Sequence, residues 1–450
     1  MGECGSRDCD ISLAGKTVLV TGAAGFIGAA LIQRIFASMT SDSVQCIFAS
    51  DVSVDSNVSV DSDESDASVS CGGTLRVVGF DNLSPYYDVE LKRARLRSIE
   101  QVATKCGAVV APPVPDAPST PEADAQYPPV HDALLAAEAD AQYPPVPDAP
   151  STPETPCAPA AEWVFIEGDI ARREELEQVF RKYRPAIVVN LAAQAGVRQS
   201  ISDPDSCFRS NTIGFYNVLE LCRHYGVEHL VYASSSSVYG SPSGASPYSV
   251  EDRTDSPVSL YAATKKGNEL MAFAYSKLYG IPSTGLRFFT VYGPAGRPDM
   301  AYFSFAETWR RGGKVRVFNY GRLSRDFTYI DDIAEGVLRV LCHPPQLHIG
   351  EDGLPLAPAR LYNIGNGRPV QMMDFLSVLS SELVGAGVLP PDFSLEAHCE
   401  FVPMQPGDVL RTCADTAPLE RDFAFRPQTD LRSGLSAFAR WYAGYCIDNK

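Results

Sequence analysis

The chain has 450 residues, of which 45% are apolar and 21% are charged, and this composition predicts a globular protein with a large buried core. Its formal net charge is -17, which argues against a surface that tracks the phosphate backbone of a nucleic acid. A small anionic ligand remains compatible, because helix N-termini and a few local cations can hold phosphates.

Strands and helices alternate along most of the chain, beginning with a strand at Lys16 to Thr21 and a helix at Phe26 to Met39. The pattern then predicts strands at 75–80, 163–167, 186–191, 229–233 and 283–288, and helices at 91–103, 173–183, 206–225 and 261–279. Such an order predicts an α/β fold with a doubly wound parallel sheet of the Rossmann type.

Two stretches interrupt this alternation. The first, at about residues 40–74, is rich in Ser and Asp, and the second, at about 107–161, repeats a Pro-rich unit of 16 residues from Pro112, Pro128 and Pro144. We expect both to be disordered insertions. Each lies between a helix and the next strand, so we expect it at the amino ends of the strands, away from the carboxyl ends where ligands bind.

The first predicted strand runs directly into TGAAGFIG, at Thr21–Gly28, where the first helix begins. Gly22 permits the tight turn, Gly25 lets the backbone approach a pyrophosphate, and Gly28 allows close packing of helix and strand. Asp81 ends the second strand and can accept hydrogen bonds from both hydroxyls of an adenosine ribose. These residues predict a dinucleotide site that favours NAD over a 2'-phosphorylated cofactor.

A Tyr and a Lys four residues apart, Tyr261 and Lys265, lie at the start of a predicted helix and share one face. A nearby ammonium favours an ionised phenol, so we expect Lys265 to lower the pKa of Tyr261 toward neutrality and make it a base. The run SSSSVYG, from Ser234 to Gly240, follows a strand and can offer hydroxyls to a reacting sugar oxygen. A polar turn without chemistry is the alternative interpretation of this run.

Together these motifs resemble the extended short-chain dehydrogenase/reductase family over almost all of the chain outside the two insertions. TGAAGFIG, NLAAQAGVRQSI, SLYAATKK, LRFFTVYGPAGRPDMA and RDFTYIDDIAEG are most similar to the UDP-glucuronate 4-epimerases of that family. The resemblance implies NAD as the cofactor, a UDP-sugar as the substrate, Tyr261 as the base, Ser235 as its partner hydroxyl and Lys265 as the cation. The implied NAD contacts are Gly22, Gly25, Phe26, Ile27, Gly28, Asp81, Asn82, Asp169, Ile170, Leu191, Ala192, Ala193, Asn211, Tyr261, Lys265 and Phe288.

The resemblance also implies a division of the chain and a pairing of copies. Residues 15–290 are expected to form the NAD-binding domain, and 291–450 mainly a smaller substrate-binding region with some elements returning to the first. A homodimer is expected to pair through the helices around 206–225 and 261–279.

The four serines discriminate among the reactions of the family. Nucleotide-sugar 4,6-dehydratases place an Asp-Glu pair at the positions of Ser236 and Ser237, and the related enzymes that form UDP-xylose carry Glu at the latter. Without a carboxylate here, elimination lacks its general acid and base, so epimerisation at C4 through a transient 4-keto sugar is expected. For a uronate substrate, the expected carboxylate contacts are Ser236, Ser237, Thr290 and Arg297, with Arg297 offering a bidentate fork.

Further along, Arg325 resembles the family's diphosphate-binding arginine, and Asp408 resembles its uridine-side acid. Gln405 stands where some relatives have Arg, and Arg411 is close enough in the sequence to substitute for it.

Other functions stay open. A UDP-glucose/UDP-galactose 4-epimerase would share every catalytic residue and differ only around C6 of the sugar. A nucleotide-sugar dehydratase or decarboxylase, and an NAD-binding scaffold without chemistry, fit less well, the latter because Tyr261 and Lys265 are both present. The repeat-bearing insertion could instead serve as a docking segment for partners.

Twelve cysteines are scattered without zinc-type spacings, which predicts a reducing compartment and no metal site. No run of 18 uncharged apolar residues and no signal peptide are present, so we expect a cytoplasmic protein without a membrane span. The first residues fit a myristoylation pattern at Gly2, with Cys4 as a palmitate site, but Glu3 makes the match poor and chance is the expected explanation.

Overall fold

The computed structural model describes residues 13–39, 73–112, 161–241, 247–404 and 408–448. Most of both predicted insertions lies outside the described residues, as do Gly2, Cys4 and Gln405.

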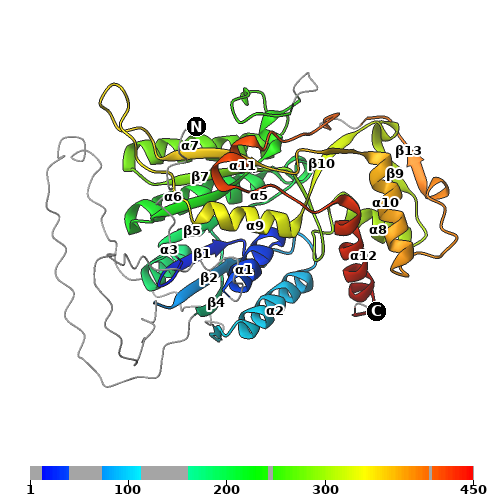
Figure 1. The fold of residues 1–450 in the computed structure, drawn as a ribbon, viewed down its shortest axis with the longest axis horizontal. Helices are drawn as coiled ribbons and strands as arrows, with labels where there is room; N and C mark the ends of the chain where they lie inside the picture. The colour runs from blue at the N-terminus through cyan, green and yellow to red at the C-terminus, as the bar shows by residue number, and fades with distance from the viewer. Residues whose placement is uncertain (1–12, 40–72, 113–160, 242–246, 405–407, 449–450) are drawn as a thin grey trace, which may run out of the picture. The chain divides into compact units, whose positions relative to one another are not determined.

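Eight parallel strands form the main sheet, in the order β11-β7-β6-β5-β1-β2-β4-β3 (Figure 1). The strands are β1 (Thr17–Thr21), β2 (Leu75–Asp81), β3 (Val109–Val110), β4 (Ala161–Glu167), β5 (Ile187–Asn190), β6 (His229–Ser235), β7 (Ser283–Phe288) and β11 (Ala359–Ile364). The central strands are buried along nearly their whole length, as expected for a sheet covered on both faces. The predicted α/β fold of the Rossmann type is therefore confirmed.

Helices cover both faces of this sheet. One face packs against α1 (Phe26–Ser38), α2 (Val89–Lys105), α9 (Ile330–Leu341) and α11 (Ala417–Phe423), and the other against α3 (Arg173–Tyr183), α6 (Gly214–Tyr225) and α7 (Leu260–Tyr279). Each face has its own apolar core, so helices and strands are fixed by burial on both sides.

The segment 206–225 is helical throughout, as predicted, but it contains a π-helical turn that the sequence does not predict. A short helix, α4 (Gln199–Ser202), precedes it. Helix α5 (Pro204–Phe208) then continues into the π-helical turn η2 (Arg209–Ile213) and from there directly into α6. A π-helical turn inserts an extra residue and is frequent at functional sites. Here it directs the buried side chain of Asn211 toward the loop after β5.

The second predicted insertion is shorter than expected, because residues at both of its ends belong to strands. Within the range 107–161, Val109–Val110 forms β3, which pairs with Glu162 and Trp163 of β4, and Ala161 already belongs to β4. Backbone hydrogen bonds to the edge of the sheet order these residues although a Pro-rich segment lies next to them in the sequence.

The C-terminal part of the chain has a third core, to which α8 (Ala301–Arg310), α10 (Met372–Gly385) and α12 (Leu431–Asp448) contribute. Its strands form two small sheets, one of β12 (Pro369–Gln371), β10 (Ser324–Tyr329) and β8 (Thr290–Tyr292), the other of β13 (Cys399–Phe401) and β9 (Val315–Val317). Short helical turns are η3 (Ser236–Tyr239), η4 (Phe318–Gly321) and η5 (Glu396–His398). In Figure 1 the strands β9, β10 and β13 lie beside α8 and α10.

Three elements of this C-terminal part, α9, α11 and β11, belong to the main sheet and the helices that cover it. Strand β11 pairs with β7, and α9 packs against α1. No helix among the described residues is long and apolar enough to cross a membrane. Over the same residues, no group of His, Cys, Asp and Glu side chains is arranged to hold a metal ion.

The glycine at the start of α1 gives a test of this packing. A Cβ atom on Gly28 would lie 2.2 Å from the carbonyl oxygen of Gly22, whereas a Cβ on Gly267 of α7 would meet nothing within 4 Å. We expect Gly28→Ala to lower the free energy of unfolding by about 1–3 kcal/mol, because backbone atoms must shift. Gly267→Ala should leave it unchanged or raise it by up to about 1 kcal/mol. Urea denaturation of both variants checks this, and equal effects would contradict it.

Candidate active site

A cavity of about 980 Å³ opens at the carboxyl ends of the main strands. It is lined by the loops after β1, β2, β5 and β6, the start of α7, and residues of the C-terminal part of the chain. The cavity brings together these sequence-predicted residues: Gly22, Gly25, Phe26, Ile27, Gly28, Asp81, Asn82, Asp169, Ile170, Leu191, Ala192, Ala193, Ser235, Ser236, Ser237, Tyr261, Lys265, Phe288, Thr290, Arg297, Arg325 and Asp408. Asn211 and Arg411 are not among its lining residues.

The glycine-rich loop forms a close-fitting floor. Gly22 has a φ of +73°, and a Cβ there would lie 2.7 Å from the backbone nitrogen of Ala192. Helix α1 begins after Gly25, and no side chain caps its first backbone N–H groups. Uncapped N–H groups at a helix start attract anions, and the missing Cβ atoms leave room for a close approach. The loop therefore fits a pyrophosphate group.

Asp81 lies beside that loop at the end of β2. Its Oδ2 accepts a hydrogen bond from the Ala24 backbone at 3.1 Å, and its Oδ1 accepts one from the Leu83 backbone at 2.9 Å. A carboxylate has about four acceptor positions, so two remain for further donors such as ribose hydroxyls.

Arg95, which the sequence did not single out, holds the loops around this part of the cavity. Its Nη1 donates to the carbonyl of Ala24, its Nε to that of Ala295, and its Nη2 to that of Gly296. The side chain is 2% exposed. It thus ties the glycine-rich loop to the loop that carries Arg297.

Tyr261 and Lys265 lie in the first turns of α7, which Ser259 caps by accepting a hydrogen bond from Ala262 at 3.1 Å. The Lys265 ammonium donates to the carbonyl of Ala233 at 2.8 Å, and this lysine is 2% exposed. Burial lowers the pKa of Lys265 to about 8. Both side chains face the cavity, with the end of β6 next to them.

The predicted lowering of the Tyr261 pKa is wrong for this structure. Burial raises the pKa of the phenol above its ordinary value, because desolvation outweighs hydrogen bonding to Ser235 and the positive charge of Arg297, which act in the opposite direction. The nearby cation that favours the phenolate is therefore Arg297. The Lys265 ammonium instead donates a hydrogen bond to the backbone carbonyl of Ala233 in β6.

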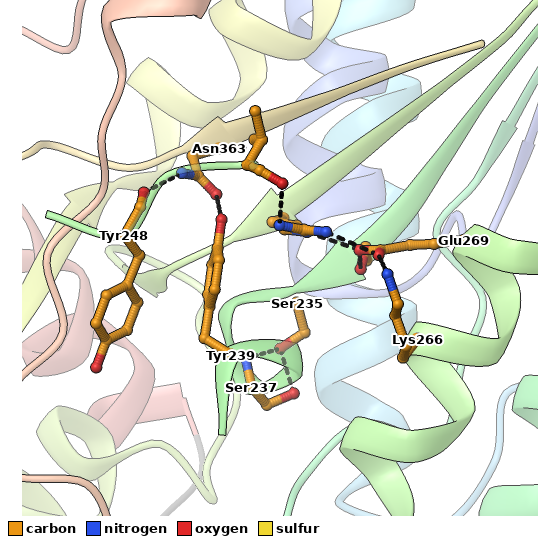
Figure 2. Close-up of polar contacts among 10 residues, drawn as sticks. Ser235, Ser237, Tyr239, Tyr248, Lys266, Glu269 and Asn363 are labelled. Atoms are coloured by element: carbon orange, nitrogen blue, oxygen red, sulfur yellow. Dashed lines mark hydrogen bonds and ion pairs between the residues drawn. The ribbon is translucent and has the colours of Figure 1, made fainter. Parts of the chain in front are cut away.

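A hydrogen-bond network connects the serine turn after β6 to α7 and β7 (Figure 2). The Ser237 hydroxyl donates to the Ser235 hydroxyl at 2.9 Å, and the Ser234 hydroxyl donates to Glu269 at 2.6 Å. Glu269 also accepts hydrogen bonds from Arg287 at 2.8 and 2.9 Å and from Lys266 at 3.2 Å. The Ser235 hydroxyl is thus oriented by a neighbour, and the strand that carries it is fixed to α7.

Tyr239 extends this network to β11. Its hydroxyl donates to Asn363, whose amide in turn donates to the carbonyl of Tyr248, and Figure 2 shows the three residues in that order. The Arg287 guanidinium lies over the Tyr239 ring, 4.8 Å from its centroid. The turn after β6 is thereby fixed to two strands of the sheet.

Asn211 supports the cavity wall without lining it. Its amide nitrogen donates to the carbonyl of Gln194 and to Thr264, and its oxygen accepts from the backbone of Gln194 at 2.8 Å. The structure therefore gives no support to the expected contact of Asn211 with the cofactor, because both the oxygen and the nitrogen of its amide are hydrogen-bonded to the protein.

Arg297 does not offer the free bidentate fork that the sequence predicts. Its Nε and Nη2 donate to the two oxygens of Asp299, at 3.0 and 2.5 Å, and Nη2 also donates to the carbonyl of Ala195. Tyr86 donates to the same Asp299 at 3.2 Å. The hydrogen bonds found for Arg297 among the described residues use Nε and Nη2, which leaves Nη1 as the nitrogen available to a ligand.

The opposite part of the cavity carries further cations. Arg325 is held by the carbonyl of Ser324 at 2.9 Å, and its pKa is lowered by burial while the charge of Asp408 acts to raise it. The sequence did not single out Arg198 and Arg316, whose guanidinium groups lie 5.5 and 5.3 Å from the ring centroid of Phe318. Aromatic and guanidinium planes suit a nucleotide base and its phosphates.

Arg411 lies beside this region through a backbone bridge to Ser324, and its carbonyl accepts a hydrogen bond from Tyr248 at 2.7 Å. Because its side chain is not among the lining residues, its suggested replacement of an arginine at position 405 gains no support from the cavity.

Comparison with known proteins places these features in one family. Residues 133–365 match the model of the NAD dependent epimerase/dehydratase family. An uncharacterised 37.6 kDa protein of Escherichia coli O111:H- is 40% identical over 82% of this chain and 92% of its own length. UDP-glucuronate 4-epimerase 4 of Arabidopsis thaliana is 42% identical over 64% of this chain and 64% of its own length.

Among solved structures, the UDP-glucuronic acid 4-epimerase of Bacillus cereus, in complex with UDP-glucuronic acid and NAD, has a TM-score of 0.64. It is 24% identical and the match covers 95% of this chain and 99% of that one, so the likeness establishes a shared fold. The family model spans more than half of the chain, and the Escherichia coli relative is matched over most of both proteins. The chain therefore belongs to the NAD-dependent epimerase/dehydratase family.

Proposed function

We propose that this protein is an NAD-dependent 4-epimerase of a UDP-sugar and that its substrate is UDP-glucuronate, which it converts to UDP-galacturonate. The observation that carries the proposal is the common cavity of Tyr261, Lys265 and Ser235 with the glycine-rich loop and Asp81. The sequence similarity to UDP-glucuronate 4-epimerases of Arabidopsis thaliana supports the choice of substrate.

The chain supplies groups for each proton movement of such a reaction. Bound NAD supplies a nicotinamide ring that takes up hydride from C4 of the sugar and returns it. Tyr261 accepts the proton of the O4 hydroxyl as the C4–H bond breaks, and the Ser235 hydroxyl orients that oxygen. This step needs the phenolate form, which the hydrogen bond to Ser235 and the charge of Arg297 favour against the opposing effect of burial on the pKa. Rotation of the 4-keto sugar within the cavity exposes its other face, and Tyr261 then returns the proton to O4, so that no net redox change occurs.

The carboxylates of the cavity favour epimerisation over elimination. A dehydratase needs an acid and a base near C5 and C6, and the turn after β6 offers the hydroxyls of Ser236 and Ser237 there. The lining carboxylates are Asp81, Asp169, Asp299 and Asp408. Asp81 and Asp169 accept backbone hydrogen bonds, and Asp299 is bound by Arg297, so they are engaged in holding the cavity together.

The carboxylate of a uronate would lie near Arg297, Thr290 and the serines. After oxidation at C4 the sugar is a β-keto acid, and holding its carboxylate in a fixed orientation opposes loss of carbon dioxide. The pairing of Arg297 with Asp299 favours the alternative substrate UDP-glucose, because the pair as a whole carries no net charge. The choice therefore rests on whether Nη1 of Arg297 contributes to turnover of the anionic sugar.

Replacement of the proposed base tests the chemistry. We expect Tyr261→Phe to lower kcat about 10²- to 10⁴-fold, the range that general acid–base groups contribute. NAD binding should be retained, because the phenol hydroxyl alone is removed. Incubation with UDP-glucuronate and resolution of the products by NMR measures the loss. A Tyr261→Phe protein that interconverts the C4 epimers at the normal rate would refute the mechanism, and a pentose product from the unmodified protein would identify a decarboxylase.

Replacement of Arg297 tests the substrate. We expect Arg297→Ala to lower kcat/KM for UDP-glucuronate about 10- to 100-fold, as for the loss of a charged hydrogen bond, with a much smaller effect on UDP-glucose. Measuring both sugars on the same protein controls for misfolding, since unfolded protein lowers both activities equally. Equal loss on the two sugars would argue for the UDP-glucose/UDP-galactose 4-epimerase instead.

We further propose that two copies pair through α7 and the segment formed by η2 and α6. Leu270 and Phe273 of α7 are 60% and 57% exposed, and Ile213 and Tyr216 of the neighbouring segment are 44% and 42% exposed. The two segments pack against each other within the chain, and from this we infer that these exposed side chains form one apolar surface. Apolar patches of this kind mark protein interfaces.

A charge in that surface should separate the copies. We expect Phe273→Glu to convert a dimer to a monomer in sedimentation velocity, because a buried unpaired carboxylate opposes association. Leu347→Glu is the matched control, since Leu347 is 58% exposed outside these helices. A dimer that survives Phe273→Glu, or a wild-type monomer, would overturn this pairing.

A further inference from the structure

Lys92 is a buried cation of the cavity that takes no part in the proposed proton movements. It lies in the first turn of α2, is 6% exposed, and lines the cavity beside Asp81. Its ammonium is 3.6 Å from Oδ1 of Asp81, which is an ion-pair distance but too long for a hydrogen bond. It also lies 5.3 Å from the ring centroid of Tyr87. Among the described residues, no hydrogen bond of this ammonium is found.

An ammonium group has three donors, and leaving them unfilled in a buried position is costly. Arg95, one turn further along the same helix, shows the contrast. Its guanidinium donates to three backbone carbonyls and to the hydroxyl of Tyr87, so it is satisfied by the protein alone. Lys92 and Arg95 are buried to similar degrees, but only Lys92 keeps its donors directed at the cavity.

The neighbours of Lys92 define what those donors would meet. Asp81 keeps two acceptor positions beside the glycine-rich loop, where a dinucleotide would present its adenosine ribose. A ribose hydroxyl can donate to a carboxylate and accept from an ammonium at the same time. The Asp81–Lys92 pair therefore matches both the donor and the acceptor of a hydroxyl.

We propose that Lys92 binds the adenosine ribose of the cofactor and that its charge, balanced by Asp81, sets how strongly a 2'-phosphate is rejected. Asp81 repels a 2'-phosphate, whereas Lys92 attracts one. In the native pair the carboxylate opposes the phosphate and the ammonium contributes to binding the ribose hydroxyls. Removal of the carboxylate charge alone would leave an unbalanced cation where the 2'-phosphate lies. This inference rests on the family's cofactor and not on the identity of the sugar.

The test compares the dissociation constants of NAD and of its 2'-phosphorylated form, measured by calorimetry on the full chain freed of nucleotide and without sugar. We expect Asp81→Asn to lower the ratio of the two constants, 2'-phosphorylated form over NAD, about tenfold, which corresponds to about 1.4 kcal/mol. In Asp81→Asn combined with Lys92→Met this gain for the phosphorylated form should disappear. Lys92→Met alone should weaken NAD binding about tenfold, since a charged hydrogen bond is lost.

Two controls separate ligand binding from folding. Lys105→Met removes the same charge from the exposed last turn of α2 and should leave both constants unchanged. Lys92→Arg keeps the charge and provides the comparison if the Met variant unfolds, with thermal denaturation as the check. Because both cofactors are measured on one protein, a purely structural role for Lys92 changes both constants together. The same ratio in Asp81→Asn with and without Lys92→Met would therefore overturn the proposal, whatever the protein does to a UDP-sugar.

Discussion

The buried ion pair between Glu269 and Arg287 fixes the reacting part of the cavity. The two side chains are 3% and 1% exposed, and each carboxylate oxygen of Glu269 accepts a hydrogen bond from Arg287. Glu269 belongs to the helix that carries Tyr261 and Lys265, Arg287 belongs to β7, and Ser234 of β6 donates to the same carboxylate. Removing one partner of such a pair costs about 3–5 kcal/mol, because it leaves a charge buried and uncompensated. Helix and serine turn are therefore held in one relative position by a contact that never faces the cavity.

The remaining parts of the site depend on the same end of the sheet. Loops that follow parallel strands meet at the carboxyl edge, and this is why residues from Gly22 to Asp408 can line one cavity. Arg95 crosses between two of these loops, and Asn211 fixes a third through both ends of its amide. These three loops are thus held by two buried polar side chains, Arg95 and Asn211, which bond mainly to backbone atoms and do not line the cavity themselves.

The sequence predicts the features that depend on neighbours within one turn or one loop. The glycine-rich turn, the spacing of Tyr261 and Lys265, and the alternation of strands and helices all carry local signatures. The sequence does not predict contacts between distant segments. Three features depend on how loops converge: Asp299 binds Arg297 and also accepts a hydrogen bond from Tyr86, Lys92 lies beside Asp81, and burial raises the pKa of Tyr261. The sequence does not predict the π-helical turn for the same reason. The backbone of Gln194, which donates a hydrogen bond to Asn211 in this turn, belongs to a loop outside the helix.

Charge within the cavity follows a rule that the net charge of -17 conceals. Three of its cations lie next to carboxylates: Lys92 beside Asp81, Arg297 beside Asp299, and Arg325 near Asp408. A buried cation without a partner would be destabilising before any ligand arrives, and pairing removes most of that penalty. The pairs at Lys92 and Arg297 leave donors uncommitted, so an anionic or hydroxylated ligand can add to the pair instead of replacing it. Selectivity at each point then depends on the balance between the two members of the pair. Among the lining residues, seven Lys and Arg side chains stand against four carboxylates, and this local excess of positive charge explains how an acidic protein can hold doubly anionic nucleotides.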